Sequence, residues 1–399
     1  MAVAYTMLTS AYREFVDSEK ASGVLLIICT IISLILANSV LGPQYLGFWH
    51  HPFAGLSVEL WVNDGLMAIF FLLIGLELVR ELDDGELSDL KSAMLPIIAA
   101  LGGIVVPASI HFYFNAGTLT QSGIGIPMAT DIAFALGALA LLGSRVPTSL
   151  KIFLTALAVI DDLGAILVIA LFYTSELAIG YLAGALATFA VLMLLNRMRV
   201  MALLPYLVGG AIMWVLMLKS GIHATIAGVL LAFAIPYASV NGNDRSPARR
   251  LEHFLHKPVA FLILPVFALA NTGILIGTDW AQHLATANST GILTGLIVGK
   301  PLGITLLSFA AIALGISRLP SDMNWRHLLG AGLLGGIGFT MSIFITNLAF
   351  PGDMETVNAS KMAILLASLV AGTLGFLWLK LFGKPVATDD DVTKLEAGV

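Results

Sequence analysis

Twelve apolar runs, most of about 20 residues and separated by short polar breaks, constrain what this chain can fold into. A helix that crosses a bilayer needs about 20 apolar residues, whereas a β-barrel shows short segments of alternating hydrophobicity. The runs therefore predict an all-α polytopic membrane protein with twelve transmembrane helices. Their expected spans are 21–41, 59–80, 94–114, 121–142, 150–174, 178–196, 203–219, 222–236, 258–276, 290–312, 328–349 and 360–381.

The composition agrees with this class, because 58% of the residues are hydrophobic and only 11% are charged. Soluble domains carry about 25% charged residues. A net charge of -5 gives no indication of nucleic-acid binding, and the single cysteine excludes an intramolecular disulfide. We therefore expect one membrane domain over residues 1–399, with an uncleaved N-terminal segment at 1–20 and a polar tail at 385–399.

The basic residues predict the orientation of the chain in the membrane. Of the 20 Lys and Arg residues, 17 lie in the N-terminal segment, the tail or the even-numbered connections between the expected helices. Two lie in odd-numbered connections, and Lys300 lies inside an apolar run. Because positive charge collects on the cytoplasmic side, both termini are predicted to be cytoplasmic.

Two adjacent aspartates, Asp161 and Asp162, lie in the middle of the expected helix 150–174. A charged aspartate at the bilayer midplane costs roughly 2.5–3.5 kcal/mol, so such residues usually mark an ion pathway. A structural ion pair or a protonated, hydrogen-bonded pair is the alternative. Neighbouring residues on a helix point about 100° apart, so the two carboxylates cannot both face one neighbour.

Two other expected helices contain features that interrupt a helix. The helix 121–142 contains Pro127, followed by Thr130 and Asp131, and the helix 328–349 contains five glycines between 330 and 338. Close packing through small residues is the alternative explanation for these glycines. Because the two helices are seven apart, they run in opposite directions and can belong to inverted repeats that bind ions at their breaks.

Lys300, between Gly299 and Pro301, is the only basic residue placed deep inside an expected helix. A buried charge persists only when it is paired, so Lys300 is expected to pair with one aspartate of 161–162. Lys300 and Asp131 are also suited to compensate the half-helix ends. The remaining carboxylate can bind a proton or a hard cation, with Thr130 adding an oxygen ligand. No cofactor is expected.

Five segments resemble the NhaA-type bacterial Na⁺/H⁺ antiporters, an inverted-repeat transporter family. These segments are 70–77, 127–134, 158–164, 299–301 and 335–342. The resemblance covers essentially the whole chain as a single transporter domain. It implies electrogenic exchange of Na⁺ or Li⁺ for H⁺ across the bacterial inner membrane, active at alkaline pH and serving pH and sodium homeostasis.

The resemblance also assigns residues. It implies that Asp162 is the main cation ligand and that Asp161 lies close by, paired with Lys300. Thr130 and Asp131 would lie at the break, with Asp131 compensating the crossed half-helices. The family is typically homodimeric, with the connection 42–58 as a β-hairpin contact; an aromatic belt at the membrane surface is the alternative for that segment.

A cytoplasmic pH sensor is a further implication, because histidine titrates near neutrality. An ordinary solvated charged face, or a packed histidine in the case of residue 223, is the alternative. The candidate residues are Glu77, Arg80, Glu81, Glu252, His253, His256 and His223.

A cation channel without obligatory proton coupling is the closest competing function. The chain lacks the Gly-x-Gly-Asp context of an intramembrane aspartyl protease, and a retinal-type pump would have seven helices. It also lacks the phosphate-binding loop of ATP-driven transporters. We therefore do not expect an enzyme.

Overall fold

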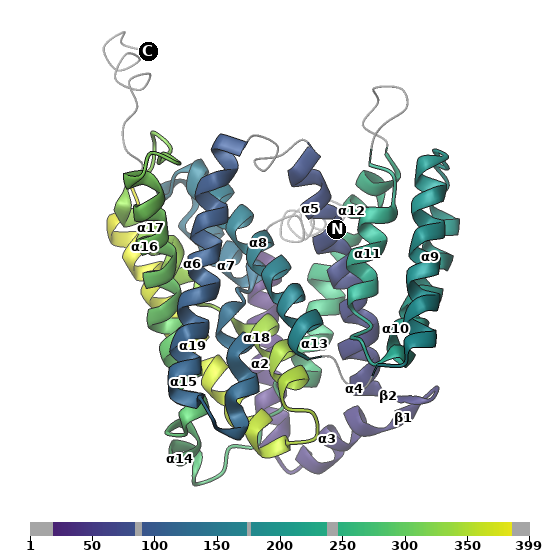
Figure 1. The fold of residues 1–399 in the computed structure, drawn as a ribbon. Helices are drawn as coiled ribbons and strands as arrows, with labels where there is room; N and C mark the ends of the chain where they lie inside the picture. The colour runs from purple at the N-terminus through teal and green to yellow at the C-terminus, as the bar shows by residue number, and fades with distance from the viewer. Residues whose placement is uncertain (1–18, 84–89, 174–176, 238–245, 385–399) are drawn as a thin grey trace, which may run out of the picture. The chain divides into compact units, whose positions relative to one another are not determined.

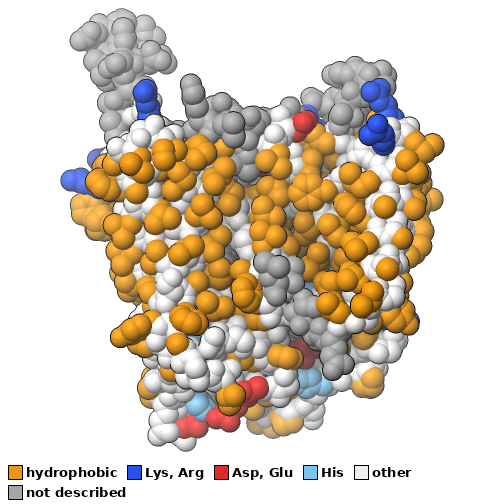
Figure 2. All heavy atoms as spheres, in the orientation of Figure 1, with side chains coloured by type: hydrophobic (Ala, Val, Ile, Leu, Met, Phe, Trp, Pro, Cys, Tyr) orange, Lys and Arg blue, Asp and Glu red, His pale blue; other side chains and the backbone are white. Residues whose placement is uncertain are grey.

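The computed structural model describes residues 19–83, 90–173, 177–237 and 246–384 (Figure 1). Within these residues, 10 helices are long and apolar enough to cross a membrane, and a bent pair makes up to 11. On the face in Figure 2, hydrophobic side chains cover the lengths of the helices, and charged side chains lie near helix ends. The all-helical, polytopic membrane class is confirmed. Most of the expected terminal segments, 1–18 and 385–399, lie outside the described residues.

The helices form two units, which are described separately. The first covers residues 1–27, 89–161 and 278–399, and the second covers 28–88 and 162–277. Two helices, α2 (Glu19–Ala37) and α8 (Thr148–Phe172), belong in part to each. The other elements of the first unit are α6 (Leu90–Asn115), η2 (Leu119–Met128), α7 (Ile132–Leu142), η3 (Gly143–Arg145), α14 (Trp280–Leu284), α15 (Ala287–Thr294), η5 (Gly295–Gly299), α16 (Lys300–Ala313), α17 (Trp325–Gly335), α18 (Phe339–Ala349) and α19 (Met354–Phe382).

The second unit contains a short antiparallel hairpin as well as helices. Its strands pair Pro52 with Ser57 and Phe53 with Leu56, within the connection where a hairpin was expected. The elements are α3 (Gly42–His50), β1 (Pro52–Phe53), β2 (Leu56–Ser57), α4 (Val58–Leu60), η1 (Trp61–Leu66), α5 (Met67–Asp83), α9 (Ile179–Arg197), α10 (Leu203–Ser220), α11 (Ile226–Ala234), α12 (Pro247–Pro258), η4 (Val259–Ile263) and α13 (Leu264–Asn271).

The apolar run at 121–142 is interrupted as its sequence predicts. Its first half is the 3₁₀ helix η2, which contains Pro127 one residue before its end. Proline lacks a backbone N–H and so cannot continue the hydrogen-bond ladder. Residues 129–131 are outside any helix, and α7 begins at Ile132 with Asp131 as its N-cap.

The glycine-rich run is also broken, and the two breaks touch. Helices α17 and α18 meet at an angle of 44° across residues 336–338. The Asp131 N–H donates to the Ile337 carbonyl at 2.6 Å. The Ser342 hydroxyl donates to the Ile126 carbonyl at 2.7 Å, which joins α18 to η2. Two discontinuous helices therefore contact each other where each is interrupted.

Glycines bring the backbones of α6 and α16 into direct contact. A Cβ added to Gly102 would overlap the carbonyl oxygen of Gly303, and a Cβ on Gly303 would overlap that of Gly102. Small residues allow such close approach between membrane helices. This contact lies one turn beyond Lys300 and one residue before Gly103, so it fixes the helices that line the site.

Among the residues that the structure describes, 10 or 11 helices are long enough to span a membrane, fewer than the twelve expected. The span expected at 222–236 is represented by α11, which has only 9 residues, whereas a helix needs about 20 to cross a bilayer. A turn at 221–225 precedes this helix, and Ile235 is already extended. The expected span counted most of this turn and Ile235 as helix because they lie in the apolar run. Hydropathy therefore overestimated the length of the helix. The span expected at 258–276 is also displaced, because the observed one covers Pro247–Asn271.

Candidate functional site: a buried ion pair at crossed helix breaks

The structure pairs Lys300 with Asp161 in the first unit. Both side chains are fully buried, and the Lys300 ammonium contacts the Oδ2 atom of Asp161. Lys300 also donates to the Thr130 hydroxyl at 2.9 Å. That hydroxyl lies 2.8 Å from Asp161 Oδ2 and 2.9 Å from the Gly335 carbonyl, so its one proton can be donated to either. An ion pair, a helix break and the last residue of α17 therefore meet at Thr130.

The second oxygen of Asp161 is available to a ligand. Oδ1 is buried and accepts no hydrogen bond from any described residue. Gly103 of α6 lies beside it, and even an added Cβ would be 3.6 Å away. A carboxylate oxygen in a buried site suits a proton or a hard cation. Oδ2 is already paired with Lys300, so Oδ1 is the oxygen of this carboxylate that can accept a proton or a cation.

Asp162 follows Asp161 in α8 and is also fully buried. The boundary between the two units falls between these residues, so Asp162 is assigned to the second unit. Asp161, and not Asp162, forms the ion pair with Lys300. This is expected for two side chains that point in different directions from one helix. The role of Asp162 as the main cation ligand stays a prediction.

Asp131 serves both half-helix N-termini at the crossing. Its Oδ1 atom accepts from the Phe134 N–H at 3.0 Å, in the first turn of α7. Its Oδ2 atom accepts from the Thr340 N–H at 3.1 Å and from the Thr340 hydroxyl at 2.5 Å, in the first turn of α18. Because helix N-termini carry partial positive charge, one carboxylate satisfies orphan donors of both half-helices.

Five of the seven pH-sensor candidates lie together in the second unit. Arg80 of α5 contacts Glu252 of α12 at 2.6 Å and Glu81 at 2.9 Å. His256 lies 3.2 Å from Glu77. Residues 247–257 were not expected to be part of the ninth span, but they form its amphipathic first turns. The resulting charged cluster joins α5 to α12.

The other two candidates are placed differently. His253 is exposed on α12, one turn before His256, and the two histidines interact electrostatically. His223 lies in the turn before α11, where its Nε2 atom is 2.9 Å from the Tyr173 carbonyl. That contact fits the packed-histidine alternative for His223.

Two members of the site were missed as individual residues. Thr340 supplies both donors to the Oδ2 atom of Asp131, and the carbonyl of Gly335 faces Thr130. The available signal for Thr340 was its place directly after the glycine-rich break, where a helix N-terminus needs an anionic partner. No sequence signal identifies a backbone carbonyl as a member of the site.

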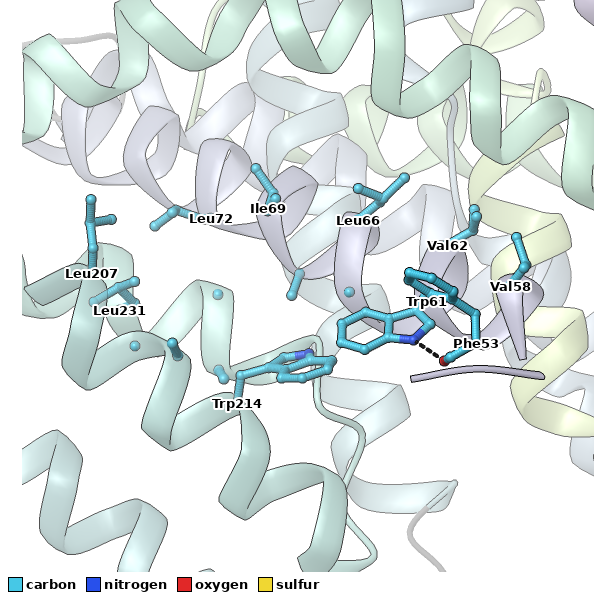
Figure 3. Close-up of a pocket in the computed structure, with 16 residues that line it drawn as sticks. Phe53, Val58, Trp61, Val62, Leu66, Ile69, Leu72, Leu207, Trp214 and Leu231 are labelled. Atoms are coloured by element: carbon cyan, nitrogen blue, oxygen red, sulfur yellow. Dashed lines mark hydrogen bonds between the residues drawn. The ribbon is translucent and has the colours of Figure 1, made fainter. Parts of the chain in front are cut away.

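An apolar pocket in the second unit has different chemistry. Its volume is about 620 Å³, and Trp61 and Trp214 stack at its edge with ring centroids 5.6 Å apart (Figure 3). The Trp61 indole N–H donates to the Phe53 carbonyl, and the Trp214 N–H donates to the Asp64 carbonyl, each at 2.9 Å. The lining residues include no ionisable side chain. The pocket therefore lacks the carboxylate oxygens that the Asp161 site offers to a cation.

Comparison with known proteins decides the family. Residues 13–379 match the family described as Na⁺/H⁺ antiporter 1. The chain is 66% identical over 383 residues to the Na⁺/H⁺ antiporter NhaA of Dechloromonas aromatica, covering 96% of this chain and 98% of that protein. The chain belongs to the NhaA family. It is also 60% identical over 373 residues to the NhaA of Flavobacterium psychrophilum, covering 94% of this chain and 96% of the relative.

Membership of the NhaA family confirms the resemblance seen in the sequence. The matched region contains the aspartate pair, Lys300, both helix breaks and the charged cluster. The protein is therefore a membrane transporter of an Na⁺/H⁺ antiporter family and not an enzyme.

Proposed function

We propose that this NhaA-family protein is a secondary active antiporter that exchanges Na⁺ or Li⁺ for H⁺ across the bacterial inner membrane. The observation that carries the proposal is the buried Asp161 carboxylate at the crossing of two broken helices. One of its oxygens is held by Lys300, and the other has no hydrogen-bond donor among the described residues. Such a group can bind either ion, which is what competitive exchange requires.

Each residue of the site has a proposed role. Asp162 is the main ligand of the transported cation, and Asp161 assists it with the oxygen that Lys300 leaves unused. Thr130 adds an oxygen to the ligand set. Asp131 compensates the two half-helix N-termini, so that the positive ends do not repel the cation from the site. No resident cofactor is needed for this chemistry.

The wider assignments are part of the same proposal. The chain forms one transporter domain with inverted repeats around the two broken helices, and twelve passages through the membrane if the short α11 counts as one. Both termini are cytoplasmic. Exchange is electrogenic, is activated at alkaline pH and serves pH and sodium homeostasis. The protein works in the lipid bilayer as a homodimer joined through the hairpin β1–β2.

Proteoliposomes with a trapped pH dye test this function. We expect Na⁺ and Li⁺, but not K⁺, to collapse an imposed pH gradient, because the small cations compete with protons for one carboxylate site. Asp162→Asn should reduce this exchange to the level of empty liposomes. The matched control is Asp279→Asn, which removes an exposed aspartate outside the site.

The same assay separates the antiporter from the cation channel. In a channel, Na⁺ would cross without moving protons, and a proton-conducting leak would not depend on the cation added. Cation-independent collapse of the gradient, or exchange that persists in Asp162→Asn, would contradict the proposed mechanism.

The charged cluster is proposed to set the pH response. Glu252→Gln removes the charge that Arg80 contacts at 2.6 Å and should release Arg80 to other partners, so the link between α5 and α12 weakens. We expect the pH profile of exchange to shift while maximal activity stays within about twofold, since the substitution lies outside the ion site. Measuring exchange from pH 6.5 to 8.5, beside the exposed control Glu355→Gln, tests this. Superimposable profiles would remove the cluster from the pH response.

A further inference from the structure

The N-terminus of α17 is capped by a histidine. The Asn324 side chain accepts from the backbone N–H groups of Arg326 and His327, at 2.9 and 3.2 Å. In return, the Asn324 N–H donates to Nδ1 of His327 at 3.0 Å. This reciprocal arrangement is a capping box, in which the returning acceptor is usually Glu or Gln. Here that acceptor is an imidazole, which can be protonated.

The hydrogen bonds define which form of His327 is present. Nδ1 accepts a hydrogen bond and therefore carries no proton. The other ring nitrogen, Nε2, lies 3.1 Å from the Lys384 carbonyl, so it carries the proton and donates it. His327 is fully buried and is neutral in this arrangement. Both ring nitrogens are used, and no lone pair remains for an additional proton without loss of a contact.

From this geometry we infer that the capping box of α17 is a pH-sensitive switch that holds only while His327 is neutral. Protonation of Nδ1 places an N–H opposite the Asn324 N–H, so that two donors face each other. It also adds positive charge at a helix N-terminus, where the partial charge is already positive. The cap is therefore closed at alkaline pH and open at acid pH.

The ionisable side chains on the elements around α17 carry charges of both signs. The elements packed against α17 are α16, α19 and α7, and α7 has no ionisable side chain. The first turn of α17 is held by the end of α19, where Trp378 donates to the Arg326 carbonyl at 2.9 Å. The Arg326 guanidinium lies 5.5 Å from the Phe382 ring. The ionisable groups on these elements, in the connection 314–324 and at the ends of α19 are Lys300, Arg318, Asp322, Arg326, Asp353, Glu355, Lys361, Lys380 and Lys384.

Helix α17 connects this cap to the ion site. It runs from Trp325 beside the cap to Gly335, whose carbonyl faces the Thr130 hydroxyl. Fraying of its first turn would loosen the helix whose last carbonyl, that of Gly335, faces Thr130. The link to transport rests on the proposed function, but the switch itself does not.

Hydrogen exchange of the peptide 324–330 tests the switch without any transport measurement. His327→Gln is the decisive variant, because its amide can accept from Asn324 and donate to Lys384 without titrating. At pH 8.5 we expect the amide hydrogens of 324–330 to exchange equally fast in wild type and variant. At pH 6 we expect exchange in the wild type to be about fivefold faster than in the variant, which is the effect of losing one cap. His283→Gln, at a half-buried histidine of α14 away from α17, is the matched control and should behave as wild type.

Equal wild-type and His327→Gln exchange at both pH values would overturn the inference. If the variant does not accumulate, the wild type carries its own control in α15. There the Thr286 hydroxyl caps the Ser289 N–H at 3.2 Å and does not titrate. Protection corrected for intrinsic exchange must fall at α17 and not at α15 between pH 8.5 and 6. A parallel fall at both helices would also overturn the inference. Absence of Na⁺/H⁺ exchange by the wild type in proteoliposomes would instead count against the proposed function.

Discussion

Replacing Lys300 with methionine should lower the apparent midpoint of thermal unfolding by about 5–10 °C and abolish ion exchange. The substitution leaves the fully buried carboxylate of Asp161 without its cation. Removing one partner of a buried ion pair costs about 3–5 kcal/mol, because the remaining charge is uncompensated. The Thr130 hydroxyl cannot replace an ammonium, since it has one proton and two oxygens within reach.

A double-mutant cycle distinguishes this explanation from lost packing. Asp161→Asn alone should also destabilise, because it leaves the Lys300 ammonium buried and uncompensated. The double variant Lys300→Met with Asp161→Asn carries no buried charge at this pair and should be more stable than either single variant. The measurement is the unfolding midpoint in detergent, followed by intrinsic tryptophan fluorescence.

Lys219→Met is the matched control, because it removes an exposed ammonium that lies 5.8 Å from the Tyr181 ring. We expect a shift of less than about 2 °C, as for most surface substitutions. If the decreases in unfolding midpoint of the two single variants simply add in the double variant, the two charges are not coupled. That result would contradict a buried ion pair between Lys300 and Asp161.

The breaks of the two discontinuous helices could be predicted because their causes are local. Pro127 cannot donate to the helix ladder, and the glycines before Phe339 favour an interruption wherever the chain leads. Both breaks appear where those residues stand. What the sequence could not provide is that the breaks meet, since the Asp131 N–H and the Ile337 carbonyl are about two hundred residues apart.

The partner of Lys300 shows a second limit. From the residues alone, either carboxylate of the pair was a possible partner, because the choice depends on which face of α8 meets α16. The family resemblance implied Asp161, and the contact agrees with that implication. The role of Asp131 has the same origin: its N-capping of α7 is local, but its bonds to Thr340 exist only because α18 begins beside it.

The short α11 shows where hydropathy misleads. An apolar run specifies that a segment is buried, but it does not specify how many residues are helical within it. Gly221 has a positive φ of 84°, which ends α10, and α11 begins five residues later. Gly228 then packs its α-carbon against the backbone of Ala68 in α5. A short helix that is held this closely by a neighbour can remain buried without the length of an independent span.

Introducing a single methyl group at Gly303 should destabilise the protein, although alanine is the better helix former. A Cβ at this position overlaps the carbonyl oxygen of Gly102, which is backbone and cannot rotate away. Relief requires α6 and α16 to separate. Overpacking typically costs about 1–3 kcal/mol, and contact with backbone places Gly303→Ala at the upper end of that range.

The separation of α6 and α16 should also affect the ion site, because each helix contributes to that site within one turn of the contact between the glycines. Lys300 begins α16, and Gly103 lies beside the Oδ1 atom of Asp161. Separation of the helices moves the ammonium and the opposite wall apart, so we expect exchange in proteoliposomes to fall by about tenfold or more, since misplacement of about 1 Å can have a hundredfold effect. Unfolding midpoint and exchange rate should therefore decline together.

Gly180→Ala is the matched control, because the same substitution is expected to be harmless at that position. Gly180 is also in a long membrane helix, α9, but an added Cβ there meets nothing within 4 Å. Its replacement should be neutral or stabilising by up to about 1 kcal/mol, because alanine loses less conformational freedom in a helix. The same chemical change is thus expected to have opposite effects at the two positions. Equal effects at both would mean that the α6–α16 contact does not require glycine.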